Sequence, residues 1–158
     1  MSKVISRVER RLQELGIELP ESSSPSGIYV STQQTGNLVY TSGKNCKKDG
    51  ELLYKGKLGK ELTIEQGQEA ARQTAINCLA VLKEHLGDLD RITKIVKVLS
   101  LVNSAPGFVQ QTEVVNGASK LFEEVLGEKG KHARSAVGVN ELPNNNPVET
   151  EIIVEVMD

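Results

Sequence analysis

The feature that most constrains this chain is a long helix pattern that begins at Thr63 and ends at Gly87. Thr63 and Gln66 have the spacing of a capping box, in which each side chain accepts a hydrogen bond from the other residue's backbone N–H. Glycine commonly ends a helix. One stripe of this helix is made of Ala71, Ala75, Cys78 and Leu82. Because small side chains let a helix approach its neighbour closely, the stripe predicts a helix packed directly on a sheet.

Strand patterns surround this helix and a second helix pattern at residues 114–127. Runs that are rich in β-branched residues or alternate in polarity mark the candidate strands 28–32, 37–43, 51–54, 92–102, 132–139 and 148–156. This order predicts an α+β fold in which two helices cover one face of a mixed β-sheet. The other face must meet solvent or another subunit, which favours an oligomer.

A further helix pattern covers residues 2–15 and is followed by a polar, turn-rich connector at 21–27. We therefore expect an N-terminal helix and connector at 1–25, packed as an appendage on a domain that spans 26–158. The first residues are charged and lack the apolar segment of a signal peptide. No stretch approaches 18 consecutive apolar residues. These patterns predict a cytoplasmic protein with no membrane partner.

The charge balance argues against a nucleic-acid partner. Nineteen basic and twenty-one acidic residues give a net charge of −2, which supplies no general attraction for phosphate. The few aromatic residues do not cluster among basic ones, as a base-stacking surface requires. Two cysteines and two histidines, far apart in the sequence, predict neither a metal site nor a disulfide framework. We expect Cys78 to be a small core residue.

The segment HARSAVGV, residues 132–139, places Arg134 on one strand face between small residues. That face holds His132, Arg134, Ala136 and Gly138, while the opposite face, which we predict to be the core side, holds Ala133, Ser135, Val137 and Val139. Ala136 and Gly138 leave room beside a guanidinium, which binds carboxylates through two parallel hydrogen bonds. The alternative is a salt bridge between Arg134 and a glutamate of the last strand.

Other candidate residues have both a functional and a structural interpretation. Glu149 could orient or activate a water molecule, or it could simply belong with Glu151 and Glu155 to a solvated strand face. The remaining candidates for a pocket are Tyr29, Ser42, Gly43 and Asn116. Their structural alternatives are packing, a turn and a close helix contact. From the residues alone, the pattern indicates an anion pocket and no more.

Six short motifs occur together in a recognisable order. They are G-x-Y (27–29), T-S-G (41–43), V-N-x-x (115–118), A-R-S (133–135), L-P (142–143) and V-E-x-E (148–151). In this combination the chain resembles the Rid family of enamine/imine deaminases, also called YjgF-like and formerly described as endoribonucleases or translation inhibitors. The resemblance covers about residues 26–157. The extra N-terminal helix and the longer middle resemble a longer subgroup.

The resemblance implies a homotrimer of chorismate-mutase-like subunits with pockets between them. It also implies hydrolysis of 2-imino or 2-enamino acids to 2-oxo acids and ammonia, without a metal or cofactor. Arg134 would hold the substrate carboxylate and Glu149 would position the attacking water. Tyr29, Ser42, Gly43 and Asn116 would line the pocket. Two departures bear on the substrate: Ala136 replaces a frequent cysteine and enlarges the pocket, and Lys44 replaces a common glutamine.

Three alternatives remain open at this point. The protein could bind a small carboxylate without turnover, or it could be a trimer that binds a partner. It could be a chorismate-mutase-like isomerase, although a single arginine is few for a substrate with two carboxylates. It could be an endoribonuclease, which the acidic, aromatic-poor composition disfavours.

Overall fold

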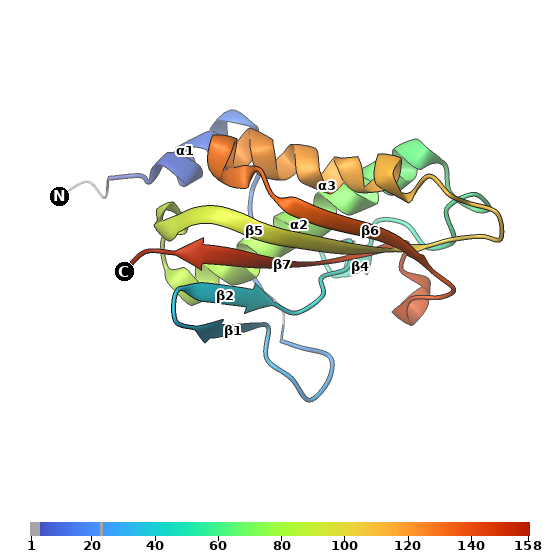
Figure 1. Cartoon of the computed structure of the whole chain (residues 1–158), viewed down its shortest axis with the longest axis horizontal. Coiled ribbons are helices and arrows are strands. Elements are labelled where there is room, and N and C mark those ends of the chain that lie inside the picture. Colours follow the sequence, from blue (N-terminus) through green and yellow to red (C-terminus); the bar gives the residue numbers. More distant parts are fainter. Residues whose placement is uncertain (1–3, 23) are drawn as a thin grey trace.

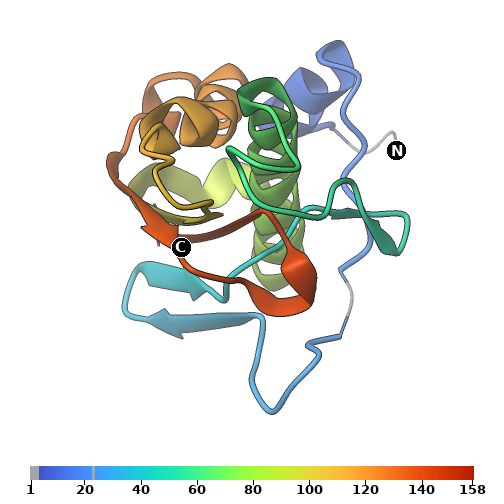
Figure 2. The same cartoon turned by 90° about the vertical axis from the view of Figure 1, so that its right-hand side faces the viewer.

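The two long helix patterns form α2 (Ile64–Leu86) and α3 (Gln111–Leu126), which lie side by side on one face of a β-sheet (Figures 1 and 2). This computed structural model describes residues 4–22 and 24–158. Both bonds of the predicted capping box are present at Thr63 and Gln66, and Gly87 caps the other end of α2. The predicted start and end of this helix are therefore confirmed.

The sheet has five strands in the order β1-β2-β7-β5-β6. Its strands are β1 (Thr32–Thr35), β2 (Leu38–Thr41), β5 (Ile92–Asn103), β6 (Ala133–Val139) and β7 (Val148–Val156). Only β5 and β6 run parallel, with α3 as the crossover between them, and the other pairs are antiparallel. β3 (Lys47–Lys48) and β4 (Glu51–Leu52) form a separate small hairpin. The predicted mixed sheet with two helices on one face is confirmed.

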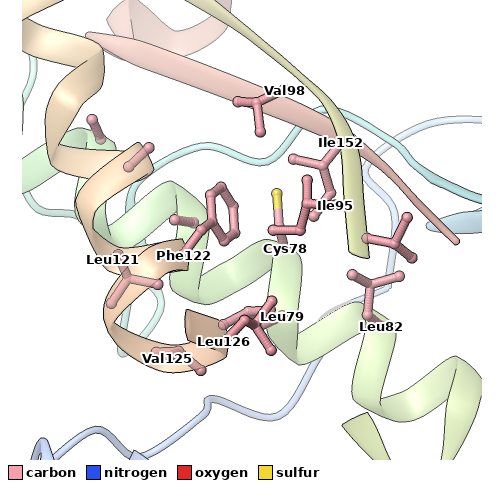
Figure 3. Packing of buried hydrophobic residues seen from close by; sticks show 14 of the residues in the cluster. Cys78, Leu79, Leu82, Ile95, Val98, Leu121, Phe122, Val125, Leu126 and Ile152 are labelled. Atoms are coloured by element: carbon pink, nitrogen blue, oxygen red, sulfur yellow. The ribbon is translucent and has the colours of Figure 1, made fainter. Parts of the chain in front are cut away.

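The core lies between the helices and the sheet. Figure 3 shows Phe122 of α3 and Cys78 of α2 directed toward Ile95, Val98 and Ile152 on the strands. All five of these side chains are at most 1% exposed. Cys78 is the small core residue that the sequence predicted, and its burial raises the pKa of the thiol to about 12. Hydrophobic burial on this one face of the sheet stabilises the domain.

The helix α1 (Arg7–Glu14) contacts the same core. Val8 and Leu12 are buried members of the cluster that α2, α3 and the sheet share. The carboxylate of Asp90, just before β5, accepts hydrogen bonds of 2.9 Å from the backbone N–H groups of Arg7 and Val8. These donors have no partner within the helix, so Asp90 caps α1 from a distant part of the chain. Residues 2 and 3 of the helix predicted at 2–15 lie outside the part of the chain that the structure describes.

One predicted strand is wrong. Residues 26–29 form bends, residue 30 has no regular structure, and strand β1 begins only at Thr32. Ile28, Tyr29 and Val30 are at least half exposed, because the connector ahead of β1 projects away from the sheet (Figures 1 and 2). The β-branched and aromatic residues of this segment predicted a strand, but a strand needs a hydrogen-bonding neighbour along its length, and the pairing with β2 begins at Thr32. Of the candidate strand at 51–54, only Glu51 and Leu52 form a strand, which is β4.

No helix within residues 4–22 and 24–158 is long and apolar enough to cross a membrane.

Helices α2 and α3 approach each other closely at Gly117. A Cβ atom added there would lie 2.2 Å from the backbone oxygen of Gln68 on α2. The side chain of Gln68 also donates a hydrogen bond of 2.9 Å to the backbone oxygen of Glu113 on α3. The glycine in the middle of this helix is therefore required by packing.

We expect Gly117→Ala to destabilise the protein by roughly 1–3 kcal/mol, because the helices would have to move apart. The sign is informative, since alanine in a helix without such a contact is more stable than glycine by about 1 kcal/mol. Chemical unfolding of the variant and of wild type measures the difference. Lys120→Ala is the matched control on α3, because the Lys120 side chain is 80% exposed. An alanine variant that is as stable as wild type would contradict the close contact.

Candidate functional site

Arg134 points toward the helix layer, so the predicted orientation of strand β6 is wrong. Its neighbour across the parallel pair is Val98, which is fully buried beneath the helices. The opposite face of β6, predicted to be the core side, is uncovered, and Val137 on it is 42% exposed. Strand β6 is at the edge of the sheet, next to β5. Small residues on the helix side let α3 approach the edge and leave room for the arginine stem.

The guanidinium of Arg134 is held by neutral acceptors on α3. Its Nη1 donates to Asn116 Oδ1 at 2.8 Å and to Ser119 Oγ at 3.0 Å, and its Nη2 donates to the backbone oxygen of Thr112 at 3.4 Å. Among the residues that the structure describes, no carboxylate lies within 4.0 Å of Arg134. The alternative of a salt bridge to the last strand is therefore not found. Three of the five N–H donors of a guanidinium are used, which leaves two.

Ser119 and His132 lie behind Arg134. Ser119 was not singled out from the sequence, and His132 was considered only as a polar residue on the same strand face as the arginine. Ser119 Oγ lies 2.9 Å from His132 Nε2, and His132 Nδ1 lies 2.6 Å from the backbone oxygen of Gly130. The His132 ring also meets the Phe122 ring edge to face at 5.9 Å. Ser119 follows Asn116 by three residues on α3, and this spacing, which places both on one helix face, was the available signal.

The space beside Arg134 is partly filled. Ala136 packs against the hydrophobic core. A Cβ atom on Gly138 would lie 2.7 Å from Nε2 of Gln111 and 2.9 Å from Oγ of Ser104. The small residues therefore accommodate side chains of α3 and of the loop before it. Any ligand of Arg134 must approach from the open edge of β6.

Glu149 lies on the uncovered face of the sheet. Its neighbours in β7, Val148 and Thr150, are fully buried beneath the helices, so the side chain between them points the other way. The carboxylate rests against Gly43, where an added Cβ atom would lie 2.8 Å from Oε2. Burial raises the pKa of Glu149, the charge of Glu151 raises it further, and Lys44 opposes both effects.

The T-S-G motif is placed beside Glu149 by a backbone bridge. Lys44 N donates to Thr150 O at 2.8 Å, and Thr150 N donates to Lys44 O at 3.0 Å. The Ser42 hydroxyl donates to Val30 O at 2.6 Å, which holds the connector against the end of β2. The geometry thus brings Gly43 to Glu149, with Ser42 next to it in the chain. Ser42 also has a structural task, because its hydroxyl hydrogen is used.

Tyr29 lies near this second group but not against Glu149. Its side chain is 51% exposed. With Gly43, Lys44 and Asn77 it lines a cleft of about 370 Å³ between the connector, the segment after β2 and helix α2. Tyr29 therefore belongs to the T-S-G side of the molecule, away from Arg134.

The predicted site residues fall into two groups that a single chain does not bring together. Arg134, Asn116 and Ala136 lie on the helix side of the β6 edge, whereas Glu149 and Gly43 lie on the uncovered face. Arg134 is opposite Val98 in β5, and Glu149 is opposite Leu101, with β5 between them. Two strand spacings and three residues along the strand separate their Cα atoms by about 14 Å. Their side chains also project to opposite faces.

No group of three or more histidine, cysteine, aspartate or glutamate residues within 4–22 and 24–158 is arranged to hold a metal ion.

Comparison with known proteins supplies close relatives. Protein TCP17 from Trypanosoma cruzi is 44% identical over 158 residues, which covers 99% of this chain and 99% of that protein. The crystal structure of Atu1372 from Agrobacterium tumefaciens, a protein of unknown function, is 42% identical with a TM-score of 0.90, and the match covers 96% of this chain and 93% of that one. The crystal structure of Escherichia coli TdcF with bound serine shares the fold, with a TM-score of 0.61 and 23% identity over 87% of this chain and 94% of that one.

A family model described as "YjgF/chorismate mutase-like, putative endoribonuclease" matches residues 9–155. The match begins within α1 and includes both groups of site residues. The chain belongs to the YjgF-like family, also called the Rid family.

Proposed function

We propose that this protein hydrolyses 2-imino and 2-enamino acids to 2-oxo acids and ammonia, in a homotrimer whose pockets lie between subunits. The observation that carries the proposal is the state of Arg134. Its guanidinium is fixed by three neutral acceptors, faces no carboxylate among the described residues, and keeps two N–H donors for a ligand. A planar anion that accepts two parallel hydrogen bonds fits this requirement, and the carboxylate of a 2-imino acid is such a group. The serine bound to TdcF carries the same carboxylate.

The opposite directions of Arg134 and Glu149 support a site made by two chains. If the edge of β6 in one subunit meets the uncovered sheet face of the next, Arg134 of the first approaches Glu149 of the second. Such a head-to-tail contact closes into a ring when the rotation allows it. The uncovered face carries apolar residues suited to burial, namely Tyr40, Leu99, Leu101, Val137 and Ile153. The number of subunits, three, follows from the family resemblance.

The hydrolysis of an imine requires few catalytic groups. Water adds to the carbon of the protonated imine while Glu149 accepts one of its protons, which gives a neutral tetrahedral carbinolamine. Glu149 returns that proton to the nitrogen. The C–N bond then breaks and ammonia leaves as the carbonyl forms, and the hydroxyl proton passes to the Glu149 carboxylate, which releases it to solvent. An enamine first becomes an imine by proton transfer to carbon. Because the imine carbon is already electrophilic, the main contributions are the placement of substrate and water and the transfer of the proton.

Ala136 and Lys44 would adjust the choice of substrate. Ala136 lies two residues after Arg134 on the same strand face and is partly buried, so the replacement of a larger side chain there leaves more room next to the guanidinium. Lys44 is close enough to Glu149 to lower its pKa. A cation at that position would favour the ionised carboxylate that accepts a proton from water.

The first test is the release of 2-oxo acid from imines generated in situ, with semicarbazide as the competing trap. We expect wild type to accelerate hydrolysis, and we expect Arg134→Ala and Glu149→Gln each to lower kcat/KM by roughly 10²-fold or more. Glu155→Gln is the matched control for Glu149, because Glu155 lies on the same face of β7 and its charge is not among those that shift the pKa of Glu149. Wild-type protein that accelerates no imine, but still binds a small carboxylate, would replace the deaminase proposal with a binding protein.

A mixture of subunits tests whether the pocket is shared. Arg134→Ala and Glu149→Gln subunits, unfolded together and refolded in equal amounts, should recover about a quarter of wild-type activity, since one interface in four then pairs an intact Arg134 with an intact Glu149. Each variant refolded alone is the control and should stay inactive. If the mixture stays as inactive as its components, both residues act within one chain and the shared pocket is wrong.

Gly43→Ala should displace the Glu149 carboxylate, because the new Cβ atom would lie 2.8 Å from Oε2. The affected atom is at the end of a flexible side chain, so we expect the free energy of unfolding to change by less than about 1 kcal/mol while kcat falls at least tenfold. Chemical unfolding and turnover measure the two effects. Thr35→Ala, at the exposed end of β1, is the control. Unchanged kcat would show that the position of Glu149 against Gly43 does not matter for the reaction.

A further inference from the structure

We infer that Ser119 and His132 are positioning residues that fix the guanidinium of Arg134 through a directed chain of hydrogen bonds. The inference rests on the proposed function for its role in substrate binding. The chain itself follows from the donors and acceptors described above, and neither Ser119 nor His132 needs to touch the substrate.

The direction of each hydrogen bond is determined by the groups at the two ends. The backbone oxygen of Gly130 can only accept, so His132 Nδ1, at 2.6 Å, must carry a hydrogen. In the neutral ring Nε2 then has no hydrogen and accepts from the hydroxyl of Ser119, at 2.9 Å. With its hydrogen used, Ser119 offers a lone pair to Arg134 Nη1 at 3.0 Å. His132 thus makes Ser119 an acceptor toward the arginine.

Arg134 needs this support because of where it lies. It is on an edge strand, and the small residues Ala136 and Gly138 beside it supply little contact for its stem. A free arginine side chain carries about 2 kcal/mol of rotamer entropy, which binding would otherwise have to overcome. Ser119 and Asn116 each accept one hydrogen of Nη1, which fixes the plane of the guanidinium. Its remaining donors then face the ligand in one orientation.

The hydrogen-bond chain ends at Gly130, which is held against the core. A Cβ atom on Gly130 would lie 2.2 Å from the backbone oxygen of Phe122, so the Gly130 backbone is pressed against the end of α3. The ring of Phe122, which is fully buried, meets the His132 ring at an interplanar angle of 85°. His132 is therefore held from two sides. The position of α3 is transmitted to Arg134 through Gly130, His132 and Ser119.

The tautomer of His132 can be tested without any assumption about function. The chain has two histidines. His85 Nε2 lies 2.8 Å from Gln34 Oε1, and the Gln34 amide nitrogen donates to Gly36 O, so His85 must donate through Nε2. Nitrogen-15 NMR of the imidazoles at pH 8 should therefore show one ring with its hydrogen on Nδ1 and one with its hydrogen on Nε2. His132→Phe should remove only the first. If His132 instead carries its hydrogen on Nε2, the inferred direction of the hydrogen bonds is wrong.

Turnover of 2-imino acids tests the positioning role. We expect Ser119→Ala and His132→Phe to raise KM roughly tenfold with a smaller effect on kcat, because carboxylate binding is the same in the ground and transition states. Ser119→Thr keeps the hydroxyl, and His132→Gln keeps an acceptor near Nε2, so both should recover part of the loss. In an Arg134→Ala background, Ser119→Ala should have no further effect, since its partner is absent.

The possible outcomes separate the two proposals. An equal loss from Ser119→Ala with and without Arg134 would make Ser119 a structural residue and overturn the inference. Wild type that does not turn over imines would contradict the proposed function. In that case the NMR result would test the direction of the hydrogen bonds. The effect of Ser119→Ala on the binding of pyruvate would test whether they help to hold a carboxylate.

Discussion

The backbone contact between α2 and α3 at Gly117 is the constraint on which the candidate site depends. With hydrogen as its only side chain, Gly117 lets α3 approach Gln68 of α2, and this closeness sets where α3 lies over the sheet. From that position Asn116 and Ser119 reach Arg134 on the edge strand β6. A wider separation of the helices would move the acceptors away from the guanidinium. The packing of the two helices therefore also determines the orientation of the site.

The sequence predicted the elements that are determined locally. Helix α2 is bounded by a capping box and a glycine, and these signals act within a few residues of the helix ends. The face of β7 that carries Glu149, Glu151 and Glu155 lies away from the helices, as the alternation of these glutamates with apolar or hydroxyl residues indicated. On strand β6 the same argument failed. Alternation says which residues share a face, but it does not say which face a helix covers.

The candidate residues were predicted individually, but their arrangement was not. Arg134 and Glu149 occur close together in the sequence, yet β5 lies between their strands and their side chains project to opposite faces. Pairing register determines this relation, and register depends on the whole sheet. Ser119 was overlooked because a serine on a helix has no distinctive pattern by itself. Its role appears only when α3 is placed beside β6 and His132.

The choice of neutral acceptors around Arg134 has a consequence for any anionic ligand. A carboxylate from the same chain would hold the guanidinium more strongly, but it would compete with the ligand for the same donors. Asn116, Ser119 and the Thr112 carbonyl orient the arginine, and no carboxylate among the described residues lies within 4.0 Å of it. An incoming carboxylate therefore meets a guanidinium that is already oriented, which lowers the entropic cost of binding. Within one subunit Glu149 points to the opposite face of the sheet, so it does not compete with a ligand for the donors of that subunit's Arg134.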